Sequence, residues 1–524
     1  MDLIAERATN GSPTLKRRWV SFASLVIFGS VLSGVLFVVT FSPMKDDIAW
    51  LLYVARKWMS GGILYLDLVE VNPPLIIWLS AIPSALARWW SLPPKLVVMP
   101  MFIMFVLACA WWATSLLQRR GGLFADRWPV FAAIGTIMLL LPGPDLGQRE
   151  HLLVAAFIPY AVLIAGALEG KDPPRTTAVA AGVLAAIFCA LKPLYAVCFL
   201  ALESLMLIKG RRPWRIMPMT AGLTLTGYVL LIVILCPAYI KHAIPMALAL
   251  YGATDVPFMD LLSDSLLLLI GEVIAFVLLS LRWKSMEHRS LMLVLVTFAI
   301  TSTIVCFVDG KDWYYHRIPA TITTVLALIL WGANELYQRH WTVRPDLVAA
   351  LLAVTVFCVS SIRQMEPELQ DALAPRHSAV ERIEDTIRVE HARSYIAFSE
   401  WIALGFPVVN NTGVTWASRF DSMWALKGEI WRKNFDPTAS QEWPIARWVT
   451  HDFIAGCPDI AVVDTREPIS FINVLRIADP AFARVWSRYR KIAAFDGLLV
   501  YKRAAPGCLD VWVAAGAPLV PVAR

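Results

Sequence analysis

Long apolar runs, separated by short charged stretches, dominate the first two thirds of the chain. Most runs approach the about 20 residues that an α-helix needs to cross a hydrocarbon core of about 30 Å. This pattern predicts a polytopic α-helical membrane protein with about 11 transmembrane helices. The predicted spans cover residues 19–42, 97–117, 128–142, 151–168, 176–191, 193–208, 214–236, 262–282, 290–307, 318–337 and 345–361.

One further apolar segment, residues 74–90, is treated differently. It has about 17 residues, short for a span, and contains Pro83. Counting it as a crossing would place Arg119 and Arg120 outside and disturb the distribution of basic loops. We therefore expect this segment to form a helix that lies against the outer face of the membrane.

The basic residues predict the orientation. Lys16, Arg17 and Arg18 directly precede the first span, and the more basic later loops fall on the same side as these residues. Because Lys and Arg are enriched in cytoplasmic loops, the N-terminus is expected in the cytoplasm. The predicted parts are a cytoplasmic N-terminus (1–18), a transmembrane domain (19–361) with a first periplasmic loop (43–96), and a periplasmic domain (362–524).

The C-terminal part, residues 362–524, has a different pattern. Its apolar runs shorten to the length of strands, as in residues 458–464 and 497–501, with polar, helix-like stretches between them. Alternating short strands and helices predict an extracytoplasmic α/β domain. Cys457 and Cys508 could form a disulfide there if the compartment is oxidising.

Composition agrees with a membrane protein. Of the 524 residues, 58% are apolar and only 17% are charged, and the mean hydropathy is +0.61. A soluble chain of this length would need more polar residues to cover its core. The net charge of +7 is first a signal of membrane topology, so we expect a lipid bilayer and not nucleic acid as a partner.

Polar residues at the predicted outer face carry the candidate chemistry, because charged groups at the depth of the membrane line cavities. Carboxylates from two loops could provide a general base and its electrostatic or metal support. Lysine, arginine and histidine could hold a phosphate. Together they suit transfer from a lipid-linked phosphate. These clusters fall in residues 45–74, 145–151, 192–193 and 309–317.

The first cluster carries a family resemblance. Residues 47–55 (DIAWLLYVA), 61–67 (GGILYLD) and 72–75 (NPPL) resemble the first outer loop of GT-C glycosyltransferases. The similarity is greatest to the group of protein O-mannosyltransferases and lipid A aminoarabinose transferases. Motifs around Glu150, Lys192 and His316 follow in the family's order, so the resemblance covers about residues 19–340.

The resemblance implies a catalytic site. Asp47 would be the catalytic base, with Asp46 as an alternative, and Glu150 would occupy the second acidic position. The base would activate an acceptor as a polyprenyl phosphate leaves the sugar with inversion. Candidates for binding the donor phosphate are Lys192, Arg149, His316 and Arg317, and candidates for the acceptor or loop are Tyr53, Tyr65, Asp67 and Glu70.

The chain also departs from the family pattern. The second acidic residue is Glu150 where Asp is more usual, and Pro193 follows Lys192 where Gly is common. Glu150 and His151, together with Asp47, could hold a divalent metal, Mg²⁺, Mn²⁺ or Zn²⁺. No HExxH or CxxC spacing is present, so the sequence leaves metal dependence open.

The resulting hypothesis is an integral glycosyltransferase of the bacterial inner membrane. It would pass a sugar from a polyprenyl-phosphate donor to a glycolipid, polysaccharide or protein acceptor on the outer face. A flippase or transporter would instead carry charges at mid-helix and related halves. A polysaccharide polymerase or ligase, or a non-catalytic GT-C-like scaffold, are further alternatives. The sequence specifies neither the sugar nor the oligomeric state.

Overall fold

The computed structural model describes residues 13–338, 345–374, 378–436, 438–504 and 507–508. The predictions for residues 1–12 and 509–524 therefore lie outside the described residues. Residue contacts divide the chain into two compact units. The helical unit comprises Met1–Thr40, Met99–Val229 and Val256–Leu369, and the mixed unit comprises Phe41–Val98, Leu230–Asp255 and Gln370–Arg524.

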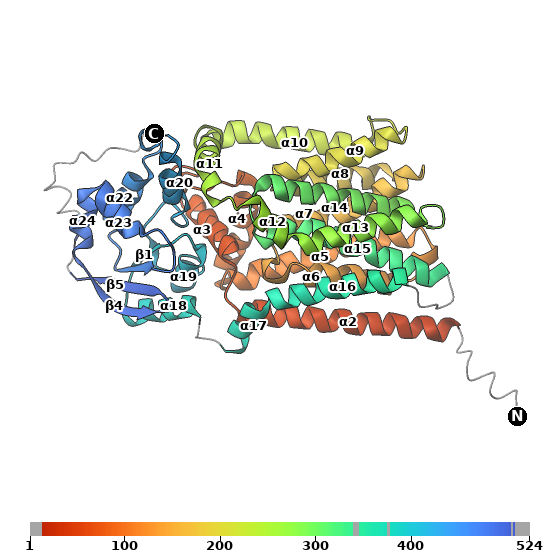
Figure 1. Ribbon diagram of the computed structural model, residues 1–524, viewed down its shortest axis with the longest axis horizontal. Coiled ribbons are helices and arrows are strands. Elements are labelled where there is room, and N and C mark those ends of the chain that lie inside the picture. Colours follow the sequence, from red (N-terminus) through yellow and green to blue (C-terminus); the bar gives the residue numbers. More distant parts are fainter. Residues whose placement is uncertain (1–12, 339–344, 375–377, 437, 505–506, 509–524) are drawn as a thin grey trace, which may run out of the picture. The chain divides into compact units, whose positions relative to one another are not determined.

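Every predicted span falls on one or two helices (Figure 1). Three of these helices, α2, α5 and α10, continue across a boundary between the units. The helices are α2 (Pro13–Phe41), α5 (Lys95–Gln118), α6 (Arg127–Leu140), α7 (Arg149–Leu168), α8 (Arg175–Cys189), α9 (Ala196–Ile208), α10 (Ile216–Leu235), α12 (Phe258–Asp264), α13 (Leu266–Arg282), α14 (Arg289–Asp309), α15 (Tyr314–Gln338) and α16 (Pro345–Gln364).

The polytopic helical fold is confirmed, but the helices differ in length. Within the described residues, 7 helices are long and apolar enough to cross a membrane, and α12 with α13, bent by 61°, would make an eighth. The helices α6, α8 and α9, which correspond to three of the predicted spans, have 14, 15 and 13 residues. A helix of that size is about 21 Å long, shorter than a hydrocarbon core of about 30 Å.

Helix α7 lies at the centre of the helical unit. It packs against α8, α14 and α15, and nearly all of its side chains are buried. Phe157 of α7 stacks on Phe298 of α14 with ring centroids 3.6 Å apart. By contrast, few side chains of α10 are buried. A helix that is apolar on all sides suits the centre of a bundle, whereas exposed apolar side chains on a spanning helix contact lipid.

The mixed unit contains a five-stranded sheet with the strand order β2-β1-β3-β5-β4. β1 pairs in parallel with β2 and β3, and β5 pairs antiparallel with β3 and β4. The α/β prediction is thus confirmed, and the predicted strands at 458–464 and 497–501 are β3 and β5. The strands are β1 (Ser394–Phe398), β2 (Thr415–Trp416), β3 (Ile460–Asp464), β4 (Tyr489–Phe495) and β5 (Leu498–Arg503).

A two-residue turn joins β4 to β5. Asp496 and Gly497 form it, both with positive φ, 50° and 74°. Asp-Gly is a favoured pair in tight hairpins because both central residues of a type I′ turn need positive φ. The local sequence therefore fixes the hairpin and the register of its strands.

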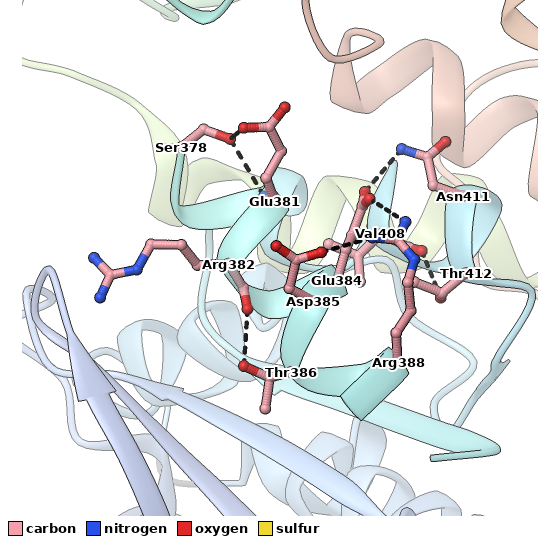
Figure 2. Close-up of polar contacts among 10 residues, drawn as sticks. All are labelled: Ser378, Glu381, Arg382, Glu384, Asp385, Thr386, Arg388, Val408, Asn411 and Thr412. Atoms are coloured by element: carbon pink, nitrogen blue, oxygen red, sulfur yellow. Dashed lines mark hydrogen bonds and ion pairs between the residues drawn. The ribbon is translucent and has the colours of Figure 1, made fainter. Parts of the chain in front are cut away.

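Helices α18 (Ala379–Val389) and α19 (Val408–Thr412) are held together by polar contacts (Figure 2). Ser378 accepts a hydrogen bond from the backbone N–H of Glu381 and caps α18, as in a capping box. The buried Glu384 accepts hydrogen bonds from Asn411 and from Arg388, at 2.8 and 2.9 Å. These donors satisfy a carboxylate that would otherwise be costly to bury.

Helices α3 (Asp46–Met59) and α4 (Pro74–Trp90) also belong to the mixed unit, where they pack against each other. Phe406 contacts Trp50 and Tyr53 of α3, and Asn410 donates a hydrogen bond to the Ala49 carbonyl at 2.8 Å. The first loop therefore forms one unit with the C-terminal part, a grouping that the sequence did not predict. The expected position of α4 at the membrane face stays a prediction.

Replacing Phe453 with Ala is expected to destabilise the mixed unit. Phe453 is fully buried, and its ring lies 5.6 Å from Phe398 and 5.0 Å from Phe482. The cavity should lower the free energy of unfolding by about 3–5 kcal/mol. Thermal unfolding of the full-length protein in detergent measures the change. The control Ile477→Ala alters a side chain that is 85% exposed and should cost less than about 0.5 kcal/mol; equal effects would contradict this packing.

Candidate functional site

Four ionisable residues of the helical unit meet in what we call the buried ion cluster: Glu150, Lys192, Asp309 and His316. Glu150 lies in the first turn of α7, where the helix dipole favours a carboxylate. Lys192 directly precedes the short 3₁₀ helix η3 (Pro193–Tyr195), and Asp309 ends α14. His316 lies near the start of α15. Helix ends and helix breaks thus supply all of these side chains.

The distances within the cluster indicate a continuous network of polar side chains. Lys192 Nζ lies 3.1 Å from Glu150 Oε1 and 3.9 Å from Asp309 Oδ2. His316 Nδ1 lies 2.5 Å from Asp309 Oδ2, and its Nε2 lies 3.8 Å from Glu150 Oε1. The Glu150 side chain is completely buried, whereas that of Lys192 remains 20% exposed. Lys192 is therefore the cationic group through which this cluster can reach a ligand.

The backbone explains how Lys192 is placed. Pro193 forces the residue before it into extended backbone, and Lys192 has φ −139°. Pro193, which stands where Gly is common in the family, therefore shapes the bend between α8 and α9. Tyr195 then donates a hydrogen bond to the His316 carbonyl at 2.8 Å, which links this bend to α15.

The other two predicted phosphate ligands differ in their surroundings. Arg317 donates to the Asp312 carbonyl at 3.1 Å, and its NH1 lies 4.0 Å from Asp264 Oδ2. Arg149 is 4% exposed and lies beside Glu150 in the first turn of α7. Among the predicted phosphate ligands, the structure brings Lys192 and His316 into contact with Glu150.

The expected metal ligand His151 is occupied. Its Nδ1 accepts a hydrogen bond from Gly147 N–H at 3.1 Å, and its Nε2 lies 2.8 Å from the Met138 carbonyl. Both ring nitrogens are used, so no lone pair is left for a metal. Among the described residues, no group of three His, Cys, Asp or Glu side chains is arranged to hold a metal ion. The described residues therefore do not fit the expected metal.

The mixed unit holds the other predicted residues. Asp46 and Asp47 occupy the first turn of α3, again at the end of the helix that favours negative charge. Glu70 is buried, and it accepts hydrogen bonds from Trp50 Nε1 at 2.5 Å and from the backbone and side chain of Asn72 at 2.7 and 2.5 Å. These donors fix Glu70 in place and tie the loop to α3.

The remaining loop candidates stabilise the first loop. Tyr65 donates a hydrogen bond to the Asn72 carbonyl at 2.8 Å, and Asp67 accepts one from Ile63 N–H at 2.9 Å. Tyr53 is buried against Trp50 with ring centroids 5.8 Å apart. These contacts give the three residues roles in loop geometry and packing.

Asp421 joins this region from the C-terminal part of the chain. The Val69 N–H donates to the Arg419 carbonyl at 2.8 Å, which brings the segment before Asp421 beside the segment that carries Glu70. Arg419 in turn forms a two-point ion pair with Asp452. Burial, together with the nearby negative charges of Glu70 and Asp47, raises the pKa of Asp421 to about 8. We call Asp47, Glu70 and Asp421 the acidic cluster.

Comparison with known proteins addresses the fold. No protein-family model and no curated protein matches the sequence. The structure superimposes on ArnT from Cupriavidus metallidurans with a TM-score of 0.52 at 11% identity, covering 94% of this chain and 100% of ArnT. The chain has the fold of a GT-C membrane glycosyltransferase. The expected resemblance is confirmed at the level of the fold, and 11% identity establishes nothing about substrates.

Two other structures resemble the chain more distantly. The mycobacterial arabinofuranosyltransferase AftD gives a TM-score of 0.42 at 12% identity, over 94% of this chain and 42% of AftD. The oligosaccharyltransferase of Archaeoglobus fulgidus gives 0.44 at 11% identity, over 92% of this chain and 74% of that enzyme. Scores at this level do not establish a shared fold, so the GT-C assignment rests on ArnT.

Within the GT-C fold, sequence reasoning missed two acidic residues. Asp309 lies inside a predicted cluster, and its position seven residues before His316 was a usable signal, since both flank a short loop between two spans. Asp421 carried no comparable signal. It lies about 350 residues from Glu70 in the sequence, and only the backbone bond between Val69 and Arg419 reveals their proximity.

Removing Lys192 is expected to destabilise the helical unit through Glu150. Lys192→Met leaves a buried carboxylate without its nearest cation and should cost about 3–5 kcal/mol. Adding Glu150→Gln removes that unpaired charge and should restore most of the lost stability. A double-mutant cycle on thermal unfolding measures the coupling. Effects that simply add within about 0.5 kcal/mol would show that the two charges are independent.

Asp421 is expected to make stability depend on pH. Between the ordinary Asp pKa of 3.8 and about 8, the folded protein keeps the Asp421 proton while the unfolded chain loses it. Stability should therefore fall as the pH rises through this range. Asp421→Asn cannot ionise, so its unfolding temperature should fall less between pH 5 and pH 8 than that of the wild type. The exposed control Asp172→Asn should follow the wild type; a variant Asp421→Asn that does so too would contradict the raised pKa.

Proposed function

We propose that the protein is an integral membrane glycosyltransferase that moves a sugar from a polyprenyl-phosphate donor to an acceptor of the cell envelope. The observation that carries the proposal is the buried ion cluster, which presents the ammonium group of Lys192 from a GT-C fold. The ArnT structure of the same fold is bound to undecaprenyl phosphate. A lipid-linked phosphate is therefore the donor chemistry that we assign to this chain.

Lys192 is the proposed contact of the donor phosphate. Its side chain is partly exposed, and the carboxylates of Glu150 and Asp309 lie close to its ammonium group. In a site with little water, an ammonium group stabilises the charge that develops on a leaving phosphate. Glu150 is completely buried and therefore acts through Lys192, as a positioning residue and not by touching the substrate.

Asp47 is the proposed general base. It takes the proton of an acceptor hydroxyl or amine while the acceptor oxygen or nitrogen attacks the anomeric carbon. The bond from that carbon to the phosphate oxygen breaks, and the polyprenyl phosphate leaves with the electron pair. The anomeric configuration inverts. Glu70 lacks this freedom because three hydrogen bonds already fix its carboxylate.

We further propose that the reaction occurs on the outer face of a bacterial inner membrane. Arg120, Arg211 and Arg282 lie at the helix ends opposite the buried ion cluster, and basic residues favour the cytoplasmic side. The disulfide between Cys457 and Cys508 suits an oxidising compartment outside the cytoplasm. Both features support a periplasmic location for the C-terminal part, which would contribute to the choice of acceptor.

The test is Asp47→Asn in membranes, with its neighbour Asp46→Asn as the matched control. Loss of the base should lower transfer by about 10²–10⁴-fold, while Asp46→Asn keeps most of the activity. Cell-surface glycolipid, polysaccharide and glycoprotein are scored against the amount of folded protein. The product that disappears identifies the acceptor class. If Asp47→Asn retains every product that is lost when the whole chain is deleted, Asp47 is not the base, and a scaffold or a transporter becomes the better explanation.

A further inference from the structure

A cavity of about 660 Å³ lies at the far end of the helical unit from the buried ion cluster. It is formed by the end of α13, the following loop and the start of α14. Apolar side chains line one part of it, and polar side chains line the other. They include Phe276, Leu279 and Leu293 on the apolar part and Trp283, Lys284 and Ser285 on the polar part.

Cationic groups surround the polar part. Lys209 Nζ and Arg289 Cζ lie 5.8 and 5.4 Å from the ring centre of Trp283, and Arg289 also donates to the Trp283 carbonyl. Lys284 lines the cavity itself. Two cations thus lie over the Trp283 ring, and a third, Lys284, directly follows Trp283 in the chain.

These cations differ from other basic residues at the same helix ends. Arg282 pairs with Asp346 at 3.5 Å, and Arg120 pairs with Glu169 at 3.4 Å. Lys209, Lys284 and Arg289 form no ion pair with any residue in the described part of the chain. Like charges held together repel each other, so an anion bound among them would stabilise the arrangement.

The apolar part of the cavity needs an apolar partner and not an anion. Phe276 and Leu281 are 54% and 74% exposed, although they lie on α13, a helix that crosses the membrane with α12. Acyl chains cover such side chains in a bilayer. An occupant that satisfies both parts of the cavity therefore has an anionic head and an apolar tail.

The position along α14 separates this cavity from the proposed catalytic site. Arg289 begins α14 and Asp309 ends it, 21 residues in all, which corresponds to about 30 Å. That length matches the thickness of a hydrocarbon core. The cavity therefore lies at the opposite membrane face from the buried ion cluster, at the level of lipid headgroups.

We propose that this cavity binds an anionic phospholipid, with the headgroup phosphate among Lys209, Lys284 and Arg289 and one acyl chain along α13. Basic pockets between transmembrane helices hold lipid headgroups in this manner. The inference is independent of the proposed sugar transfer, because it concerns different residues at the other membrane face.

Native mass spectrometry of the full-length protein tests the proposal, with phosphatidylglycerol and phosphatidylcholine as the two probes. The wild type should retain one phosphatidylglycerol in preference to phosphatidylcholine. Lys284→Gln and Arg289→Gln should each weaken this binding by about fivefold, since one basic residue near an anionic headgroup contributes about that factor. Ser280→Trp, which fills the cavity without changing any charge, should also displace the lipid.

The matched control is Arg175→Gln. Arg175 is an exposed basic residue at the start of α8, at the same helix ends, but it does not line the cavity. It should leave binding unchanged. Equal loss in Arg175→Gln would indicate general attraction between charges, and equal retention of both lipids by the wild type would exclude an anionic headgroup; either result would overturn the proposal. So would full binding by Ser280→Trp.

Discussion

The carboxylate of Glu150 has no exposed surface, and the helical unit is built around the need to compensate its charge. An ionised carboxylate in apolar surroundings is costly unless cations or donors lie close to it. Lys192 meets this need from the bend between α8 and α9, with its Nζ 3.1 Å from Glu150 Oε1, and His316 lies 3.8 Å from the same oxygen in the first turn of α15. The ends of these helices must therefore keep a fixed register. Asp309, which ends α14 where the helix dipole disfavours an acid, is held by the same two residues.

The buried acidic residues of the mixed unit have surroundings that differ from those of Glu150. Glu70 accepts hydrogen bonds from N–H donors of Trp50 and Asn72. Asp421, beside Glu70 and Asp47, keeps its proton up to about pH 8, which avoids a further negative charge. Groups of the same chemical type thus differ in charge because their surroundings differ. Asp46 and Asp47 share the first turn of α3, and Asp47 is the carboxylate that we propose as the base.

Patterns of local sequence predicted the features that local physics determines. The apolar runs located the helices, the shortened runs located β3 and β5, and the family motifs selected Glu150, Lys192 and His316. The runs at α6, α8 and α9 correspond to helices of 14, 15 and 13 residues, because a run read from hydropathy does not reveal where a helix such as α9 begins. The burial of the acidic side chains could not be predicted either, because no local signal distinguishes the fully buried Glu150 from the partly exposed Asp47. Asp421 was missed because its neighbours come from the other end of the chain.

The two ends of α14 differ in whether nearby basic side chains are paired with carboxylates of the protein. At the Asp309 end, Lys192 lies close to two carboxylates of other segments, those of Glu150 and Asp309. At the Arg289 end, Lys209 and Arg289 lie over the ring of Trp283 and Lys284 follows it, and among the described residues none of these three cations forms an ion pair. A protein that merely needed basic loops for orientation would not have to place them around one ring beside a cavity. The arrangement is explained if the missing negative charge belongs to the membrane, so that a bound lipid completes this end of the helical unit as the carboxylates complete the other.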